Sequence, residues 1–133
     1  MGKIYTSMGL MSGTSLDGID VSIIKSDGKE EYSTELDRYF EYDKELVQKL
    51  LEIRDKLLNL EDLGRYFSEI KDLEREVTLF HFKAVNETIE KFNSNIDLIG
   101  FHGQTIFHDP KKKISKQLGD GMLLSQLTKK KVV

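Results

Sequence analysis

The period of the hydrophobic pattern changes near residue 43, and this change constrains the fold more than any other feature of the chain. Before it, residues 19–25 alternate apolar and polar side chains, the pattern of a half-buried strand. Residues 3–11 and 31–42 predict two further strands, and Asp27-Gly28 marks a hairpin turn. Three antiparallel strands are therefore predicted to come first.

After residue 43 the apolar residues recur at three- and four-residue steps, which predicts helices. Asp43 is the predicted N-cap of a first helix, and Asn59 that of a second, which runs to about Phe92. The stripe of the second helix suits packing on a sheet and also suits a coiled-coil arm. The last third predicts a strand over residues 96–101, one that begins at 106–107, one over 114–118, a helix over 120–127 and a strand that opens at 129–133. This order indicates an α/β fold with a mixed sheet.

Composition excludes several classes of protein. The net charge of −3 over 133 residues is too small to direct binding to nucleic acid or to a membrane surface. The chain has no cysteine, which excludes disulfides and cysteine-ligated zinc and fits a reducing compartment. No apolar run approaches the roughly 20 residues that cross a bilayer, and the N-terminus does not resemble a signal peptide. We expect a cytoplasmic protein.

Residues 9–20, Gly-Leu-Met-Ser-Gly-Thr-Ser-Leu-Asp-Gly-Ile-Asp, join the first two predicted strands and carry the clearest chemistry. Glycine lets backbone amides approach a ligand closely, and successive amides with hydroxyls form an anion-binding concavity. Asp17 and Asp20 would repel a bare phosphate but suit one that carries Mg²⁺. A plain hairpin turn has the same composition, so the residues alone leave both interpretations open.

Three segments together resemble the anhydro-N-acetylmuramic acid kinase family. They are residues 9–20, Ile99-Gly-Phe-His-Gly-Gln-Thr-Ile-Phe-His-Asp-Pro110 and Gln117-Leu-Gly-Asp-Gly-Met-Leu-Leu124, in the order and at the spacing of that family. The resemblance implies a ribonuclease-H-like (actin-like ATPase) half domain, with residues 1–133 as the N-terminal domain of a sugar kinase. Because the resembled family continues further, we expect the chain to be part of a larger protein. A basic tail at 129–131 that binds an acidic partner is the competing interpretation.

The resemblance also implies an activity for the whole protein. The resembled kinases hydrolyse and phosphorylate 1,6-anhydro-N-acetylmuramic acid to N-acetylmuramic acid 6-phosphate, a step in the recycling of cell-wall sugar. ATP and Mg²⁺ are the implied cofactors, no nucleic acid or membrane partner is expected, and a homodimer of the full-length protein is left open. Asp17 is the implied metal residue, acting through water. The implied cofactor-binding residues are Gly13, Thr14, Ser15, Leu16, Asp17, Gly18, Ile19 and Asp20.

The second and third segments supply the implied sugar contacts. His102 equally suits a role in tying its loop to the backbone. Asp120-Gly121 replaces an asparagine-proline common in the family, so the local backbone is expected to differ. The implied substrate-binding residues are His102, Gly103, Gln104, Thr105, Gln117 and Gly119.

No catalytic residue is assigned within the chain. The resemblance implies an aspartate base after Val133, so we expect the isolated chain to have little or no kinase activity. A non-catalytic half-domain module that pairs with a second polypeptide is the alternative from a different class of function. A glycerol or hexose kinase is a third interpretation, and the His102–Thr105 block argues against it.

Overall fold

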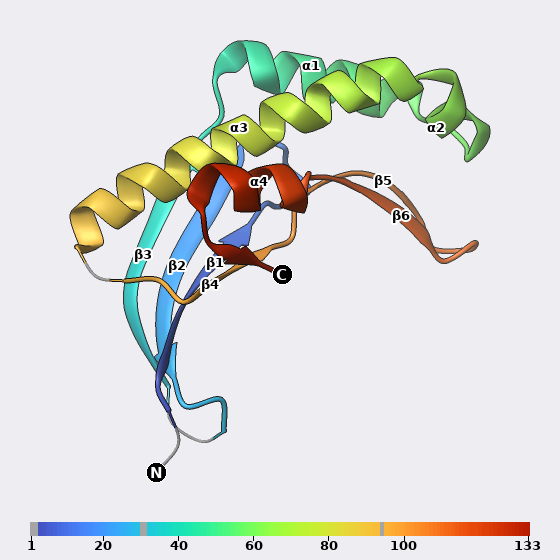
Figure 1. Ribbon diagram of the computed structural model, residues 1–133. Coiled ribbons are helices and arrows are strands. Elements are labelled where there is room, and N and C mark those ends of the chain that lie inside the picture. Colours follow the sequence, from blue (N-terminus) through green and yellow to red (C-terminus); the bar gives the residue numbers. More distant parts are fainter. Residues whose placement is uncertain (1–2, 30–31, 94) are drawn as a thin grey trace.

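The computed structural model describes residues 3–29, 32–93 and 95–133. A five-stranded sheet forms one layer, and helices cover one of its faces (Figure 1). Glu31, where the third strand was predicted to begin, lies outside the described residues. The mixed α/β architecture agrees with the fold class predicted from the hydrophobic pattern.

The sheet is mixed, with the strand order β3-β2-β1-β4-β7. β1 (Tyr5–Met11), β2 (Gly18–Ser26) and β3 (Tyr32–Glu41) are antiparallel, which confirms the three predicted N-terminal strands. β4 (Leu98–Phe101) runs parallel to β1, and β7 (Lys131–Val132) runs parallel to β4. The chain therefore leaves β1 and β4 at the same edge of the sheet, where ligands bind in many open α/β folds.

β5 (Gln104–Asp109) and β6 (Ile114–Leu118) pair only with each other among the described strands. They form a hairpin that projects away from the main sheet (Figure 1). The Asp109 carboxylate accepts hydrogen bonds from the amides of Lys111 and Lys112, over 3.1 and 3.3 Å, and so shapes the turn. Both strands were predicted, but a strand pattern does not say which strand is the partner.

The described residues form the helices α1 (Lys44–Lys56), α2 (Glu61–Arg65), α3 (Phe67–Phe92) and α4 (Gly121–Thr128), of which α3 lies against the sheet and α1 packs on α3 (Figure 1). Asp43 occupies the predicted N-cap position of α1, but its side chain makes no capping hydrogen bond.

The prediction of one helix from Asn59 to about Phe92 is wrong at its start, because the helix is interrupted at Tyr66. The buried carboxylate of Asp62 accepts from the amides of Leu58 and Asn59, over 2.9 and 3.1 Å. Asp62 thus ties the residues between α1 and α2 to the first turn of α2.

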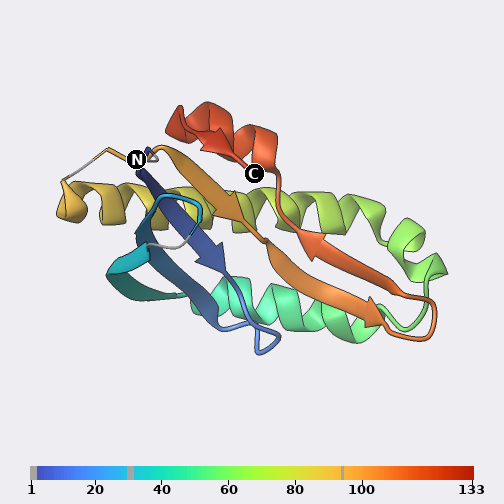
Figure 2. The ribbon, with the colours of Figure 1, turned by 90° about the horizontal axis from the view of Figure 1, so that it is seen from below.

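The core lies between α3 and the strands. Figure 2, seen from below, shows α3 crossing behind the strands. Val77 and Val85 of α3 are fully buried, as are Met8 of β1 and Ile23 of β2. The apolar stripe of α3 is therefore a sheet-packing face, and the coiled-coil interpretation is wrong. None of the helices among the described residues is both long enough and apolar enough to span a membrane.

Candidate functional site

The loop between β1 and β2 carries the predicted phosphate contacts. Ser12 and Leu16 are buried, whereas Gly13, Thr14 and Ser15 between them are exposed. Within the part of the chain that the structure describes, the backbone amides of these three exposed residues donate no hydrogen bond. Such a turn suits an anionic ligand, because each N–H group can donate to it.

The neighbouring residues shape this loop. Leu16 has a left-handed backbone with φ 61°, and its side chain is fully buried. At Gly18 a Cβ atom would come within 2.3 Å of the carbonyl oxygen of Phe40, so glycine is required there. Ile19 belongs to the core, and Asp20 is exposed on β2. Cofactor contact by these residues stays a prediction, and what the structure adds is their role in setting the loop conformation.

Asp17 lies exposed beside the loop and accepts two hydroxyl hydrogen bonds. Ser15 Oγ donates to Asp17 Oδ1 over 2.8 Å, and the Tyr39 hydroxyl donates to the same carboxylate. These bonds, that from Ser15 first, hold the pKa of Asp17 below its ordinary value, so the group is ionised at neutral pH. Burial and the bond to Asp17 raise the pKa of Tyr39 to about 12, which keeps its hydroxyl a donor.

The donor set around Asp17 fits only one way of holding a metal. Among the residues that the structure describes, no cluster of three or more His, Cys, Asp or Glu could bind an ion. Mg²⁺ commonly keeps several waters and uses one or two carboxylates together with phosphate oxygens. A single ionised carboxylate such as Asp17 therefore fits a water-mediated contact to a phosphate-bound Mg²⁺.

Asp17 also borders an open groove with a volume of about 470 Å³. Tyr39 and Tyr42, which belong to none of the three segments, lie on and after β3, far from the loop in sequence. The β2–β3 register, which places Tyr39 opposite Asp20, is the signal that could have linked them to the site. The groove is lined by Asp17, Tyr39, Glu41, Tyr42, Lys44 and Val47.

A second, smaller pocket of about 140 Å³ brings the other two segments together. His102 is exposed, and its Nδ1 lies 3.1 Å from the carbonyl oxygen of Gly103, to which it donates. Nε2 is then the atom that can meet a ligand. Four of the six predicted substrate residues line this pocket, namely His102, Gly103, Gln117 and Gly119.

Gln104 lies between the loop and this pocket. Its side chain is fully buried, and Nε2 donates to the carbonyl oxygens of Gly13 and Thr105, over 2.8 and 3.2 Å. Oε1 accepts from the Tyr42 hydroxyl over 3.0 Å. Thr105 Oγ1 lies 3.5 Å from Gln117 Nε2, which donates to it. Substrate contact by Gln104 and Thr105 stays a prediction, and in the structure Gln104 ties the second segment to the first.

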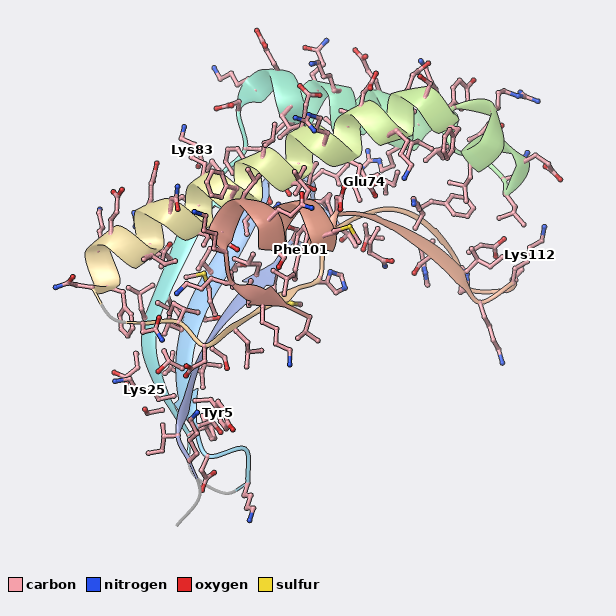
Figure 3. All side chains as sticks on the ribbon, in the orientation of Figure 1. Tyr5, Lys25, Glu74, Lys83, Phe101 and Lys112 are labelled. Atoms are coloured by element: carbon pink, nitrogen blue, oxygen red, sulfur yellow. The ribbon has the colours of Figure 1, made fainter. Side chains whose placement is uncertain are left out.

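The third segment is hydrogen-bonded to α3, and the sequence did not predict this contact. The Gly119 amide donates to a Glu74 carboxylate oxygen over 3.3 Å, and the Asp120 amide donates to Thr78 Oγ1 over 3.0 Å. Figure 3 shows Glu74 beneath α3, near the start of α4. The Asp120 side chain caps α4 by accepting from the Leu123 amide over 3.0 Å. An aspartate therefore suits this position, because it caps the helix that follows.

Comparison with known proteins gives the following similarities. The sequence model described as anhydro-N-acetylmuramic acid kinase matches residues 5–133. A protein of that name from Pelagibacter ubique is 54% identical over 133 residues, which cover 100% of this chain and 36% of the relative. The one from Agrobacterium fabrum is 38% identical over 96% of this chain and 35% of the relative. The one from Rhizobium etli is 37% identical over 100% of this chain and 37% of the relative. The chain thus spans about a third of the length of these curated relatives.

Proposed function

The chain belongs to the anhydro-N-acetylmuramic acid kinase family, and on that basis we propose that it supplies the nucleotide loop and part of the sugar site of an ATP-dependent kinase. The proposed acceptor is 1,6-anhydro-N-acetylmuramic acid, and the product is N-acetylmuramic acid 6-phosphate. The names of the relatives support the kinase class and the sugar.

One observation carries this proposal: the two chain segments that leave β1 and β4 are bonded to each other. The His102 amide donates to the Leu10 carbonyl oxygen over 3.3 Å, and Gln104 Nε2 donates to the Gly13 carbonyl oxygen over 2.8 Å. A loop suited to phosphate therefore lies next to a pocket lined by hydrogen-bonding side chains. Phosphoryl transfer needs that adjacency, because catalysis of it depends mainly on positioning and electrostatics.

The residues of the chain have separate tasks in this proposal. Bound ATP with Mg²⁺ would supply the phosphoryl group. The amides of residues 13–15 donate to phosphate oxygens, and Asp17 orients a water of the metal shell. His102 and Gln117 hydrogen-bond the hydroxyl or amide groups of the sugar.

The hydrolytic half of the reaction needs a base. A water oxygen bonds to the anomeric carbon as the bond from that carbon to O6 breaks. O6 bonds to the γ-phosphorus of ATP as ADP leaves, and the base takes the proton of the water. The described residues that line the pocket at His102 include no carboxylate. We therefore propose that the base comes from outside this set of residues and that the 133-residue chain alone turns over little substrate.

The ribonuclease-H-like assignment is also part of this proposal. Its support is the strand order β3-β2-β1-β4-β7, with three antiparallel strands followed by two that are parallel to β1. A mixed sheet that begins with antiparallel strands and has packed helices is what the resemblance implies.

Nucleotide binding is tested by calorimetric titration of Mg-ATP into the purified 133-residue chain. We expect saturable binding that Asp17→Asn weakens roughly ten-fold, about the loss of one charge-assisted interaction. Asp37→Asn, which neutralises an exposed carboxylate on β3, serves as the matched control and is expected to leave the Kd unchanged. Wild-type protein that binds no Mg-ATP would refute the nucleotide-binding role.

Catalysis is tested in a chimera in which residues 1–133 replace the matching segment of the Pelagibacter ubique relative, 54% identical to them. A coupled assay should show ADP release that depends on the anhydro-sugar, at a rate within about ten-fold of the unmodified relative, while the isolated chain shows none. A folded chimera that binds Mg-ATP and releases no ADP with the anhydro-sugar would refute the proposed substrate.

A further inference from the structure

Four buried polar side chains form a line directly beneath the loop. Ser12 Oγ lies 3.4 Å from His81 Nε2 and 3.2 Å from the Tyr42 hydroxyl, and that hydroxyl lies 3.0 Å from Gln104 Oε1. None of the four side chains is more than 6% exposed. They come from the loop, the residue after β3, the middle of α3 and the start of β5, so the line joins four separate parts of the fold.

The two ends of this line are both hydrogen-bond acceptors. His81 Nδ1 lies 2.7 Å from the Val77 carbonyl oxygen, which can only accept, so Nδ1 carries the proton. Burial lowers the pKa of His81 to about 4, so the ring is neutral at pH 7 and Nε2 has no proton. At the other end, Gln104 Nε2 faces two carbonyl oxygens, which orients Oε1 toward Tyr42.

The three contacts of the line therefore share two hydroxyl protons, those of Ser12 and Tyr42. The Tyr42 hydroxyl donates to Gln104, because Oε1 can only accept, and burial keeps it protonated by raising the pKa of Tyr42 to about 12. The single Ser12 proton is then shared between His81 and Tyr42. Both rings are fixed by packing. The Tyr42 ring meets Phe80 edge to face, with 5.0 Å between the ring centroids, and the His81 ring lies 4.8 Å from that of Phe101, centroid to centroid.

We propose that Tyr42 and His81 are positioning residues of the nucleotide loop. His81 holds Ser12, which begins the loop, and Tyr42 holds Gln104, whose amide holds the Gly13 carbonyl oxygen. The Ser12 side chain and the carbonyl oxygen of the Gly13–Thr14 peptide unit are thereby fixed, and the exposed amides beside them are oriented before a ligand arrives. The proposal rests on the proposed function for the ligand, and it assigns a role to two residues that lie outside all three sequence segments.

The first test compares Tyr42→Phe with Tyr32→Phe in the 133-residue chain. Tyr42→Phe keeps the ring contact with Phe80 and removes only the hydroxyl, whereas Tyr32 is 75% exposed and serves as the matched control. We expect the amide resonances of residues 13–15 to shift in Tyr42→Phe and the Kd of Mg-ATP to rise at least five-fold. Tyr32→Phe should change neither. A folded Tyr42→Phe chain with unshifted loop amides and an unchanged Kd would overturn the proposal.

The second test does not depend on nucleotide. The chain has three histidines, and His102 and His108 are exposed, so they act as internal references for His81 in ring ¹⁵N spectra. The spectrum should show His81 as the neutral Nδ1–H form at pH 7, and Ser12→Ala should move its Nε2 resonance, because that atom loses its donor. A proton found on Nε2 at pH 7 would refute the arrangement. If wild-type chain binds no Mg-ATP, the proposed function fails, while the loop-amide shifts still decide whether Tyr42 and His81 position the loop.

Discussion

Leu16 combines two features that oppose each other in free energy. Its left-handed backbone, with φ 61°, costs about 1–2 kcal/mol for a residue with a Cβ atom. Its fully buried side chain recovers about 2 kcal/mol through the hydrophobic effect. The loop is thus held in a strained conformation by an apolar anchor, an arrangement that is common where a backbone must present itself to a ligand.

This balance predicts an unusual order of stability for two substitutions. Leu16→Ala keeps the strain and loses the anchor, so the free energy of unfolding should fall by about 3 kcal/mol. Leu16→Gly loses the same anchor but relieves the strain, and it should be more stable than Leu16→Ala by about 1 kcal/mol. Urea denaturation measures both, and an alanine variant that is the more stable of the two would contradict the strain at this position.

Gly18 gives a second prediction, because a Cβ atom there would lie 2.3 Å from the backbone oxygen of Phe40. The strand pair must separate to admit it, so Gly18→Ala should lower the free energy of unfolding by about 2 kcal/mol or more. Gly64 in α2 is the matched control, since a Cβ atom there meets nothing within 4 Å. Gly64→Ala should raise the free energy of unfolding by up to about 1 kcal/mol. Equal effects of the two substitutions in thermal or urea unfolding would contradict the prediction.

His81 predicts how stability depends on pH. In the unfolded chain its pKa is the ordinary 6.5, and burial lowers it to about 4 in the folded chain. Above pH 6.5 the ring is neutral in both states and contributes no pH dependence. As the pH falls from 6.5 to 4 the unfolded state takes up the proton first, so stability is lost, by roughly 3 kcal/mol at pH 4.

The contribution of His81 is isolated by comparing variants. His81→Gln should remove this loss between pH 6.5 and 4, while His108→Gln, at an exposed position of the β5–β6 hairpin, should retain it. The quantity to compare is the slope of the free energy of unfolding against pH, measured in urea. Parallel slopes for the wild-type chain and His81→Gln would show that the ring titrates normally in the folded state.

Among single residues, sequence reasoning located those whose local composition is distinctive. The glycines and hydroxyls of residues 9–20 indicated the loop, and the exposed amides at Gly13–Ser15 suit that interpretation. Tyr39, Tyr42 and His81 could not be found this way, because a lone tyrosine or histidine on a strand or helix has no local signature. Their importance depends on which elements meet, and that is a property of the packed chain.

Aspartates occupy the N-cap positions of α1 and α4, but only one of them makes a capping bond, and this difference gives a further prediction. Asp120 accepts from the Leu123 amide over 3.0 Å, whereas Asp43 occupies the same position of α1 without a side-chain capping bond. Asp120→Ala should therefore lower the free energy of unfolding by about 1 kcal/mol more than Asp43→Ala does. Urea denaturation of the two variants tests this, and equal losses would show that the observed bond contributes nothing.

For the helices and strands, the period of the hydrophobic pattern predicted that nearly every element exists, but it did not predict where most of them begin and end. The stripe of α3 and the alternation of β2 follow from the sequence, since each face must be buried. The junction before α2 does not, because it depends on Asp62 bonding backward to the amides of Leu58 and Asn59. Local pattern gives the existence of an element, whereas its ends depend on particular hydrogen bonds.

In the molecule as a whole, the approach of the three segments is a consequence of topology. β1 and β4 are parallel neighbours although residues 12–97 lie between them in the chain, so the loop and His102 emerge side by side. The sequence predicted the mixed α/β class and the three segments. It did not predict the isolated β5–β6 hairpin, because period-two alternation is the same for a strand that joins the main sheet and for one that does not.

Gln104 Nε2 donates to the Gly13 carbonyl oxygen, and this bond requires a fixed number of residues between His102 and Gln104. Gly103 has a left-handed backbone, with φ 83°, that sets the direction in which the chain enters β5, so one residue inserted there would move the Gln104 amide away from the loop. An insertion in the lysine-bearing tip of the hairpin, several residues further on, would leave that geometry intact. Tolerance to insertions should therefore change abruptly within a few residues of the same hairpin.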